Sequence, residues 1–358
     1  MKFSCFLALC VALSANAEDI TPRIGIVEVY GVRKVSAEKI KSSIGAKPGA
    51  PLPARSAAEE KLDKLSGVVA SHIQIVCCDG QQTILYVGVE ERNAPHIEFH
   101  ANPVADIFLP KEITEKYDAF IDALAVSMRA HTADEDLTNG YSLMADPDCR
   151  DLQTALIPLV AANLTNVDQV LRTAGDAEQR AAAAYVIQYG PRSVRASKII
   201  ADALQYALQD PDETVRKNAM ISLKAVMVGA RLHRDQQIHI EPTWFVELMN
   251  SAVWSDRRNA SLALLTMTDK PNPEALDLIR QRAMPSVIEM ARWHDLEHAL
   301  PGFILAGRLA GADEKEIQAA WLSGNRDEIL RRAENPNGKH GGITGLLHHD
   351  DARKTDGQ

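Results

Sequence analysis

The stretch Asp210–Gly229, DPDETVRKNAMISLKAVMVG, contains the pattern on which much of the chain is built. After an Asp-Pro turn, apolar residues recur every three or four positions, at Val215, Ala219, Leu223 and Val226. This spacing places them on one face of an α-helix, and Gly229 is a suitable helix stop. The stretch therefore predicts an amphipathic helix that buries one side against its neighbours.

The same pattern recurs on both sides of this stretch. Arg216–Leu223 aligns with Arg257–Leu264, a looser copy lies at Arg180–Ile187, and a weaker one lies at Ala299–Gly311. From the first arginine of one copy to the next is 36 and then 41 residues, which is the range of stacked helix-pair repeats.

The D-P-x-x-x-V-R-x-x-A pattern of Asp210–Ala219 resembles the bacterial HEAT repeat. The resemblance implies an α-solenoid of HEAT-like helix pairs, which we expect at 151–333 in a mostly α protein. Solenoids of this type usually bind partners. The expected helices are Leu152–Asn163, Val167–Ala174, Glu178–Tyr189, Val194–Leu208, Thr214–Val228, Pro242–Ala252, Arg257–Thr266, Pro273–Arg282, Ser286–Arg292, Glu297–Ala310 and Glu314–Leu322.

Three arginines occupy the same position of the repeat, and each has acidic residues nearby in the sequence. The arginines are Arg180, Arg216 and Arg257, and the acids are Asp176, Asp212 and Asp256. We expect an exposed ladder of ion pairs between repeats, in which each pair contributes roughly 0–1 kcal/mol. This interpretation is structural and assigns no ligand to the row.

The composition is that of an ordinary globular protein. Of 358 residues, 46% are hydrophobic and 24% are charged, an amount of chain that suits two or three domains. The formal net charge of −9 argues against a nucleic-acid partner, which would need a concentrated basic face.

The N-terminus has the three parts of a secretory signal peptide, predicted at 1–17. Lys2 is the basic end, Phe3–Leu13 the apolar core, and Ala15-Asn16-Ala17 a small-x-small cleavage site. The alternative is an N-terminal anchor, but the apolar run is shorter than the ~20 residues of a spanning helix. We therefore expect an exported protein, periplasmic or secreted, without a membrane span.

The segment 18–93 predicts a small α+β domain. Ile24–Tyr30 is rich in β-formers, Ser36–Ile44 is a short helix with Ser36 as N-cap, and Arg55–Leu65 is a second helix. Two further strands, Val68–Cys78 and Thr83–Glu90, are joined through the hairpin dipeptide Asp79-Gly80. The order is strand, helix, helix, strand, strand.

This order resembles a POTRA domain, as do the run Ile24–Gly31, the turn Pro48–Leu52 and the ending Val87–Arg92. The resemblance implies an adaptor whose exposed sheet edge accepts an extended peptide as an added strand. The alternative is a packing module that caps or orients the solenoid.

The segment 94–150 is expected to be a connector with one helix, Pro110–Ala130, and an acidic loop at 134–148. The loop contains Asp134, Glu135, Asp136, Asp146 and Asp148. From Asp134 the sixth position is Asn139 and the twelfth Ala145, which does not match an EF-hand loop. Helix capping and turn formation are the simpler interpretation. A metal site is the alternative.

Once the leader is removed, three cysteines remain: Cys77, Cys78 and Cys149. In an oxidising compartment Cys149 can form one disulfide, with Cys77 or with Cys78, which leaves one thiol over. The alternative is that Cys77 or Cys78 is a small buried apolar residue. The four tryptophans, Trp244, Trp254, Trp293 and Trp321, are expected in the core, with a surface aromatic patch as the alternative.

Sequence motifs of common enzymes are absent. The chain contains no nucleophile elbow, P-loop, H-E-x-x-H or Gly-rich dinucleotide turn. The triplet His96, Glu98 and His100 and the histidines of the tail, His340, His348 and His349, are weak metal motifs. The tail 334–358 is expected to be disordered. We assign no catalytic, cofactor-binding or metal-ligating residue.

The stretches Ser142–Pro147, Asp210–Arg216, Pro242–Phe245 and Ala299–Pro301 are similar to a group of exported bacterial HEAT-repeat proteins without a settled function. We expect a non-enzymatic scaffold that binds another envelope or secreted protein. The alternatives are a metal-dependent or hydrolytic enzyme with its site at 134–148, and a structural cap for a larger complex.

Overall fold

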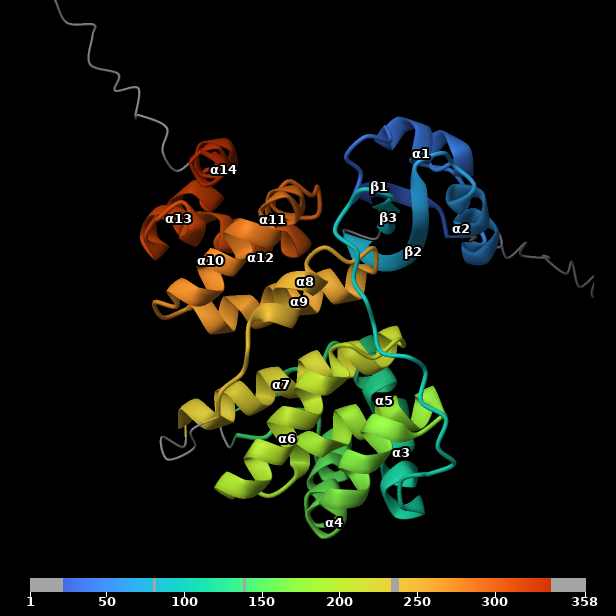
Figure 1. The fold of residues 1–358 in the computed structure, drawn as a ribbon, viewed down its shortest axis with the longest axis vertical. Helices are drawn as coiled ribbons and strands as arrows, with labels where there is room; N and C mark the ends of the chain where they lie inside the picture. The colour runs from blue at the N-terminus through green and yellow to red at the C-terminus, as the bar shows by residue number, and fades with distance from the viewer. Residues whose placement is uncertain (1–21, 80–81, 138–139, 233–237, 336–358) are drawn as a thin grey trace, which may run out of the picture. The chain divides into compact units, whose positions relative to one another are not determined.

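The computed structural model describes residues 22–79, 82–137, 140–232 and 238–335 (Figure 1). The chain divides into two compact units, Met1–Arg92 and Asn93–Gln358. The described part is mostly helical, with a small mixed sheet and helices at the N-terminal end, which confirms the predicted class. The expected leader and nearly all of the expected tail lie outside the described residues.

The first unit has the predicted element order, strand, helix, helix, strand, strand. The elements are β1 (Ile24–Tyr30), α1 (Ala37–Ile44), α2 (Arg55–Asp63), β2 (Val68–Asp79) and β3 (Gln82–Glu91). The sheet order is β1-β3-β2, with β1 parallel and β2 antiparallel to β3. Two parallel strands need a long crossover between them, and part of it is formed by α1 and α2.

The helices of this unit cover one face of the sheet. The core of the unit lies between the helices and the strands. Ser36 caps α1 as predicted, because its hydroxyl accepts a hydrogen bond from the Lys39 N–H at 3.2 Å. The buried core cluster consists of residues of this unit alone: Ile24, Ile40, Ala46, Ala58, Leu62, Val68, Ile73, Leu85, Val87 and Val89.

A buried carboxylate fastens the end of β3 to the loop before α1. Glu91 accepts the N–H groups of Arg33 at 2.7 Å, Lys34 at 3.0 Å and Val35 at 2.9 Å. Burial alone would raise the pKa of the Glu91 carboxyl, but these three donors outweigh it and lower the pKa. Glu91 therefore stays ionised within the fold.

The second unit begins with an extended segment, 93–110, and the helix α3 (Lys111–Ala130), close to its predicted bounds. The acidic loop forms a short hairpin, β4 (Glu135–Asp136) with β5 (Leu143–Met144). The helix α4 (Pro147–Thr173) follows, with Asp146 as its N-cap.

The two helices predicted at Leu152–Asn163 and Val167–Ala174 join into the single kinked helix α4. Asn163 has non-helical dihedrals, φ −122° and ψ 17°, and its side-chain amide donates to the Leu159 carbonyl at 2.8 Å. The break therefore falls at the predicted end of the first helix, and residues 164–166, expected between the two helices, are helical as well.

The remaining helices alternate with short turns. They are α5 (Ala177–Val186), α6 (Val194–Ala207), α7 (Glu213–Leu232), α8 (Thr243–Leu248), α9 (Trp254–Thr268), α10 (Pro273–Arg282), α11 (Met284–Ala291), α12 (Leu296–Leu309), α13 (Glu314–Leu322) and α14 (Arg326–Glu334). A 3₁₀ turn, Ile187–Tyr189, follows α5. We did not predict α14, a short helix with low mean hydropathy.

The four sequence copies lie on helices that pack against one another in succession. The copies fall on α5, α7, α9 and α12, and α5 packs on α7, α7 on α9, and α9 on α12. Within the described ranges, none of the helices combines the length and the apolar character that crossing a bilayer requires.

Candidate functional site

The recurring arginines are buried, which corrects the expectation of an exposed ladder. Arg180 donates through Nε and Nη2 to both oxygens of Asp210, at 2.8 and 2.9 Å. Arg216 holds Asp256 in the same way, with Nη2 at 2.8 Å from Oδ2. Arg257 donates to Glu289 at 2.7 Å. Each pair joins one helix pair to the next.

Of the three acids expected as partners, only Asp256 pairs with one of these arginines. Asp176 and Asp212 instead cap helices α5 and α7, since they accept the N–H groups of Glu178 and Thr214 at 2.8 Å. The side chain of an Asp just before a helix accepts a hydrogen bond from a backbone N–H of the first turn of that same helix. The arginine therefore reaches the following repeat for its carboxylate.

Each arginine also holds main-chain carbonyls of the turn that precedes its own helix. Arg180 donates to the Ala174 carbonyl at 2.9 Å, Arg216 to that of Asp210 at 2.9 Å, and Arg257 to that of Ser251 at 2.7 Å. We call these three residues the arginine row. Arg180 and Arg216 thereby hold the two turns against which the extended segment lies.

The extended segment 93–110 is bound along these turns by main-chain hydrogen bonds. Ala105 donates to the Thr173 carbonyl at 3.0 Å and accepts from the Gly175 N–H at 2.8 Å, which forms a parallel bridge at Ala174. One repeat further on, the His100 N–H donates to the Gln209 carbonyl at 2.8 Å. The segment therefore contacts two successive turns.

Side chains add selectivity to this contact. The guanidinium of Arg216 lies 4.1 Å from the centre of the Phe99 ring, and the His100 ring lies 4.3 Å from that of Tyr206. The backbone of Val104 lies close to Gly175, since a Cβ at Gly175 would be in van der Waals contact with it at 3.4 Å. His100 is thus a packing residue, not part of the metal triplet considered from the sequence.

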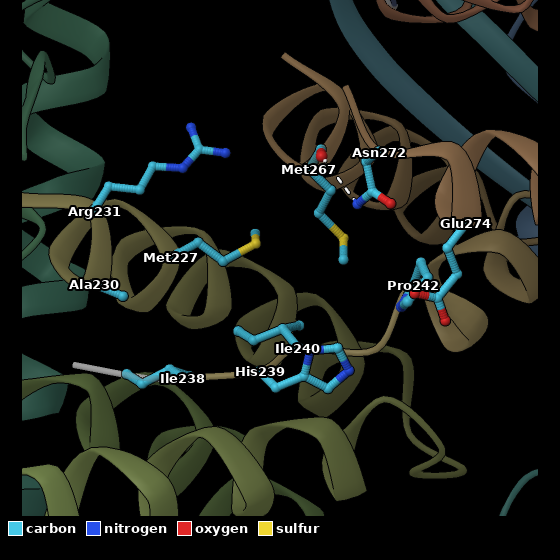
Figure 2. Close-up of a pocket in the computed structure, with 10 residues that line it drawn as sticks. All are labelled: Met227, Ala230, Arg231, Ile238, His239, Ile240, Pro242, Met267, Asn272 and Glu274. Atoms are coloured by element: carbon cyan, nitrogen blue, oxygen red, sulfur yellow. Dashed lines mark hydrogen bonds between the residues drawn. The ribbon is translucent and has the colours of Figure 1, made fainter. Parts of the chain in front are cut away.

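An open pocket of about 320 Å³ lies where α7, the segment before α8 and the α9–α10 turn meet (Figure 2). Six of its ten lining residues are apolar: Met227, Ala230, Ile238, Ile240, Pro242 and Met267. Its polar lining consists of Arg231, His239, Asn272 and Glu274.

Three of the four polar lining residues form a hydrogen bond or ion pair with a neighbouring group. Arg231 pairs with both oxygens of Asp269, at 2.6 and 3.0 Å, so its charge is neutralised. The Asn272 amide donates to the Met267 carbonyl at 3.2 Å. His239 contacts Glu241 through Nε2 at 2.7 Å.

The acidic loop uses its carboxylates to hold the fold together. Glu135 pairs with Lys224 and accepts from Ser142, and Asp136 lies 3.1 Å from Arg150. Asp146 caps α4. Across the described part of the chain, no three His, Cys, Asp or Glu side chains come together as a metal site. Glu135, Asp136 and Asp146 of the loop therefore have structural contacts.

The hairpin is anchored by a buried glutamine. Gln153 accepts from the Met144 N–H at 2.7 Å and donates to the Ser142 carbonyl at 3.2 Å and to the Tyr189 hydroxyl at 2.9 Å. Burial raises the pKa of Tyr189 well above its ordinary value, so this hydroxyl remains a neutral donor to the Ser142 carbonyl. Gln153 therefore anchors the hairpin at Ser142 and Met144 to the buried helices.

Cys149 carries a free, buried thiol, so the bridge to Cys77 or Cys78 is not formed at this residue. The side chains of Cys77 and Cys78 lie outside the described residues. Burial raises the pKa of the Cys149 thiol, and the nearby carboxylate of Asp146 adds to this.

Of the four tryptophans only Trp293 is fully buried; the other three are half-buried.

No protein-family model matches the chain, and no curated protein matches its sequence. The pocket residues were missed in the sequence because they come from three separate segments and form no motif. The extended segment was likewise predicted only as part of a connector, since its main-chain hydrogen bonds leave no pattern in the sequence.

Proposed function

We propose that this chain is a non-enzymatic binding protein of the bacterial envelope. In this proposal a POTRA-like domain precedes a HEAT-like α-solenoid, and the protein is exported and holds an extended segment of another envelope or secreted protein. The successive packing of α5, α7, α9 and α12, which carry the four sequence copies, supports the solenoid part of the proposal.

The observation that carries the proposal is the bound segment 93–110. The turns between the helices of the second unit already hold an extended chain through main-chain donors and acceptors. Ring contacts at Phe99 and His100 add to these hydrogen bonds. Main-chain hydrogen bonds recognise an extended conformation independently of most of its sequence. A partner segment in the same conformation would satisfy the same groups.

Strand addition to the sheet of the first unit receives less support. The Ile73 N–H of β2 already donates to the Glu59 carboxylate at 2.8 Å, and the start of β1 is bridged by the turn at Gly49–Pro51. An added strand would have to displace these groups. The proposal therefore places partner binding on the second unit.

The test releases the internal segment and offers it back as a separate peptide. Ala105→Pro removes the N–H that donates to the Thr173 carbonyl, and faster amide exchange at Gly175 reports release. A fluorescent peptide with the sequence of residues 93–110 should then bind this variant saturably, and should not bind the wild type.

The control is Ala101→Pro, at an exposed position between the two main-chain contacts. This variant should keep its own segment bound and should not take up the peptide. If Ala105→Pro is folded and has released the segment but binds no peptide, the array does not bind extended chains in trans and the proposal fails.

A further inference from the structure

The pocket brings together two thioethers and one imidazole from different segments. Met227 lies on α7, Met267 on α9 and His239 on the chain between α7 and α8. Figure 2 shows both methionine side chains extending into the space between α7 and the α9–α10 turn, with the His239 ring at its other wall. We propose that this set binds Cu(I).

The ligand types select this metal. Thioether sulfur is a soft donor that favours Cu(I), and imidazole suits copper as well, whereas Mg²⁺ and Ca²⁺ require several oxygen ligands. The lining residues include one carboxylate, that of Glu274. Thioethers carry no proton at any ordinary pH, so protons do not compete with a metal for the two sulfur atoms.

The surroundings of His239 fit a ligand role. Its Nε2 lies 2.7 Å from the Glu241 carboxylate; when Nε2 donates its proton to this acceptor, the lone pair remains on Nδ1 for a metal. Glu241 in turn is placed by its own N–H, which donates to Gln205 on α6 at 2.8 Å. A carboxylate behind a histidine is the usual outer partner of a metal-binding imidazole.

The charge balance of the site also admits a cation. Arg231 would repel a metal ion, but its guanidinium is held by Asp269 through two contacts and by the Thr266 carbonyl. Glu241 contributes a negative charge next to His239. The proposal is independent of peptide binding by the extended segment, which contacts other residues of α6 and α7, Tyr206 and Arg216.

The first experiment uses silver(I), which binds the same soft ligands and has no redox chemistry under these conditions. The protein carries ¹³C-labelled methionine methyl groups, in a background where Cys77, Cys78 and Cys149 are replaced by alanine to remove competing thiols. One equivalent of silver(I) should shift the methyl signals of Met227 and Met267 and leave that of Met128 unchanged. Unshifted Met227 and Met267 signals would overturn the proposal.

The second experiment measures Cu(I) affinity by competition with a chromogenic chelator without oxygen. Met227→Leu, Met267→Leu and His239→Gln should each weaken binding by about tenfold or more, and Glu241→Gln by roughly tenfold. Leucine conserves the volume and apolar character of methionine, so a pocket that only accepts apolar groups would not distinguish these variants.

The matched control is Met128→Leu, at an exposed methionine of α3 outside the pocket. It should bind Cu(I) like the background protein. Melting curves without metal check that each variant is folded. If the folded leucine variants bind Cu(I) as tightly as the control, the pocket is not a copper site.

Discussion

The arginine row shows that the contribution of an ion pair to stability depends on how deeply the pair is buried. An exposed ion pair contributes little, because water solvates both partners well in the unfolded chain and in the folded one. Arg180 and Arg216 are instead almost fully buried with their carboxylates, and each makes several hydrogen bonds. Removing one partner then leaves a charge in a site that water does not reach.

Arg216→Leu should therefore reduce the free energy of unfolding by about 3–5 kcal/mol at neutral pH, because Asp256 is left buried and unpaired. Arg231→Leu is the matched control. It removes another two-contact pair between neighbouring helices, with Asp269, but one that is exposed, and should lose less than about 1 kcal/mol. Urea unfolding of both variants measures the difference, and equal losses would contradict the prediction.

The loss in Arg216→Leu should depend on pH. Burial already raises the pKa of Asp256 in the wild type against the opposing pull of Arg216, and without the arginine this pKa rises further. A folded-state pKa above the unfolded value means that stability is highest below the unfolded pKa and falls as the pH rises. The gap between variant and wild type should therefore shrink from pH 7 to pH 4.

At the scale of elements, the β2 strand illustrates how a sheet edge is protected. An edge strand presents backbone N–H groups that could pair with another chain. In β2 the Ile73 N–H is taken by Glu59 of α2, which is also held by Arg55 at 3.0 Å. A helix that covers the sheet thus supplies a side chain that occupies the edge.

Glu59→Ala should expose this N–H, and amide exchange at Ile73 should accelerate by about tenfold or more. The control is Glu60→Ala, one residue further along the same helix, where the carboxylate pairs with Lys64 on an exposed face. Both variants change helix propensity equally, so only the edge contact differs. Equal exchange rates at Ile73 in the two variants would show that Glu59 does not protect the edge.

At the scale of the whole molecule, the chain has two compact units, and the core of the first draws on its own residues alone. Leu62→Ala removes a fully buried side chain of α2 and should destabilise the first unit by about 2–5 kcal/mol. Amide exchange should show loss of protection in β1, β2 and β3, with α5 and α7 unchanged.

The reciprocal variant is Leu204→Ala, at a fully buried position of α6 in the second unit. It should lower protection in α6 and α7 and leave β3 unchanged. If either substitution lowers protection equally in both units, the two cores unfold together and the division into independent units does not hold for stability.

The sequence alone was sufficient for the class of fold and for most elements. Apolar spacing predicted the helices from α5 to α13, and alternating β-formers with a hairpin dipeptide predicted β2 and β3, because these features depend on residues near one another in the chain. The N-cap at Ser36 and the helix α3 follow from the same local rules. The short polar helix α14 was missed, since few of its residues are apolar.

Only the tertiary structure decided what these residues contact. Burial of Arg180 and Arg216, the choice of Asp210 over Asp176, the course of segment 93–110 and the meeting of Met227, Met267 and His239 all depend on residues brought together by packing. Sequence spacing determines which face of a helix a side chain occupies. It does not determine what lies opposite that face, because this depends on how successive helices are stacked.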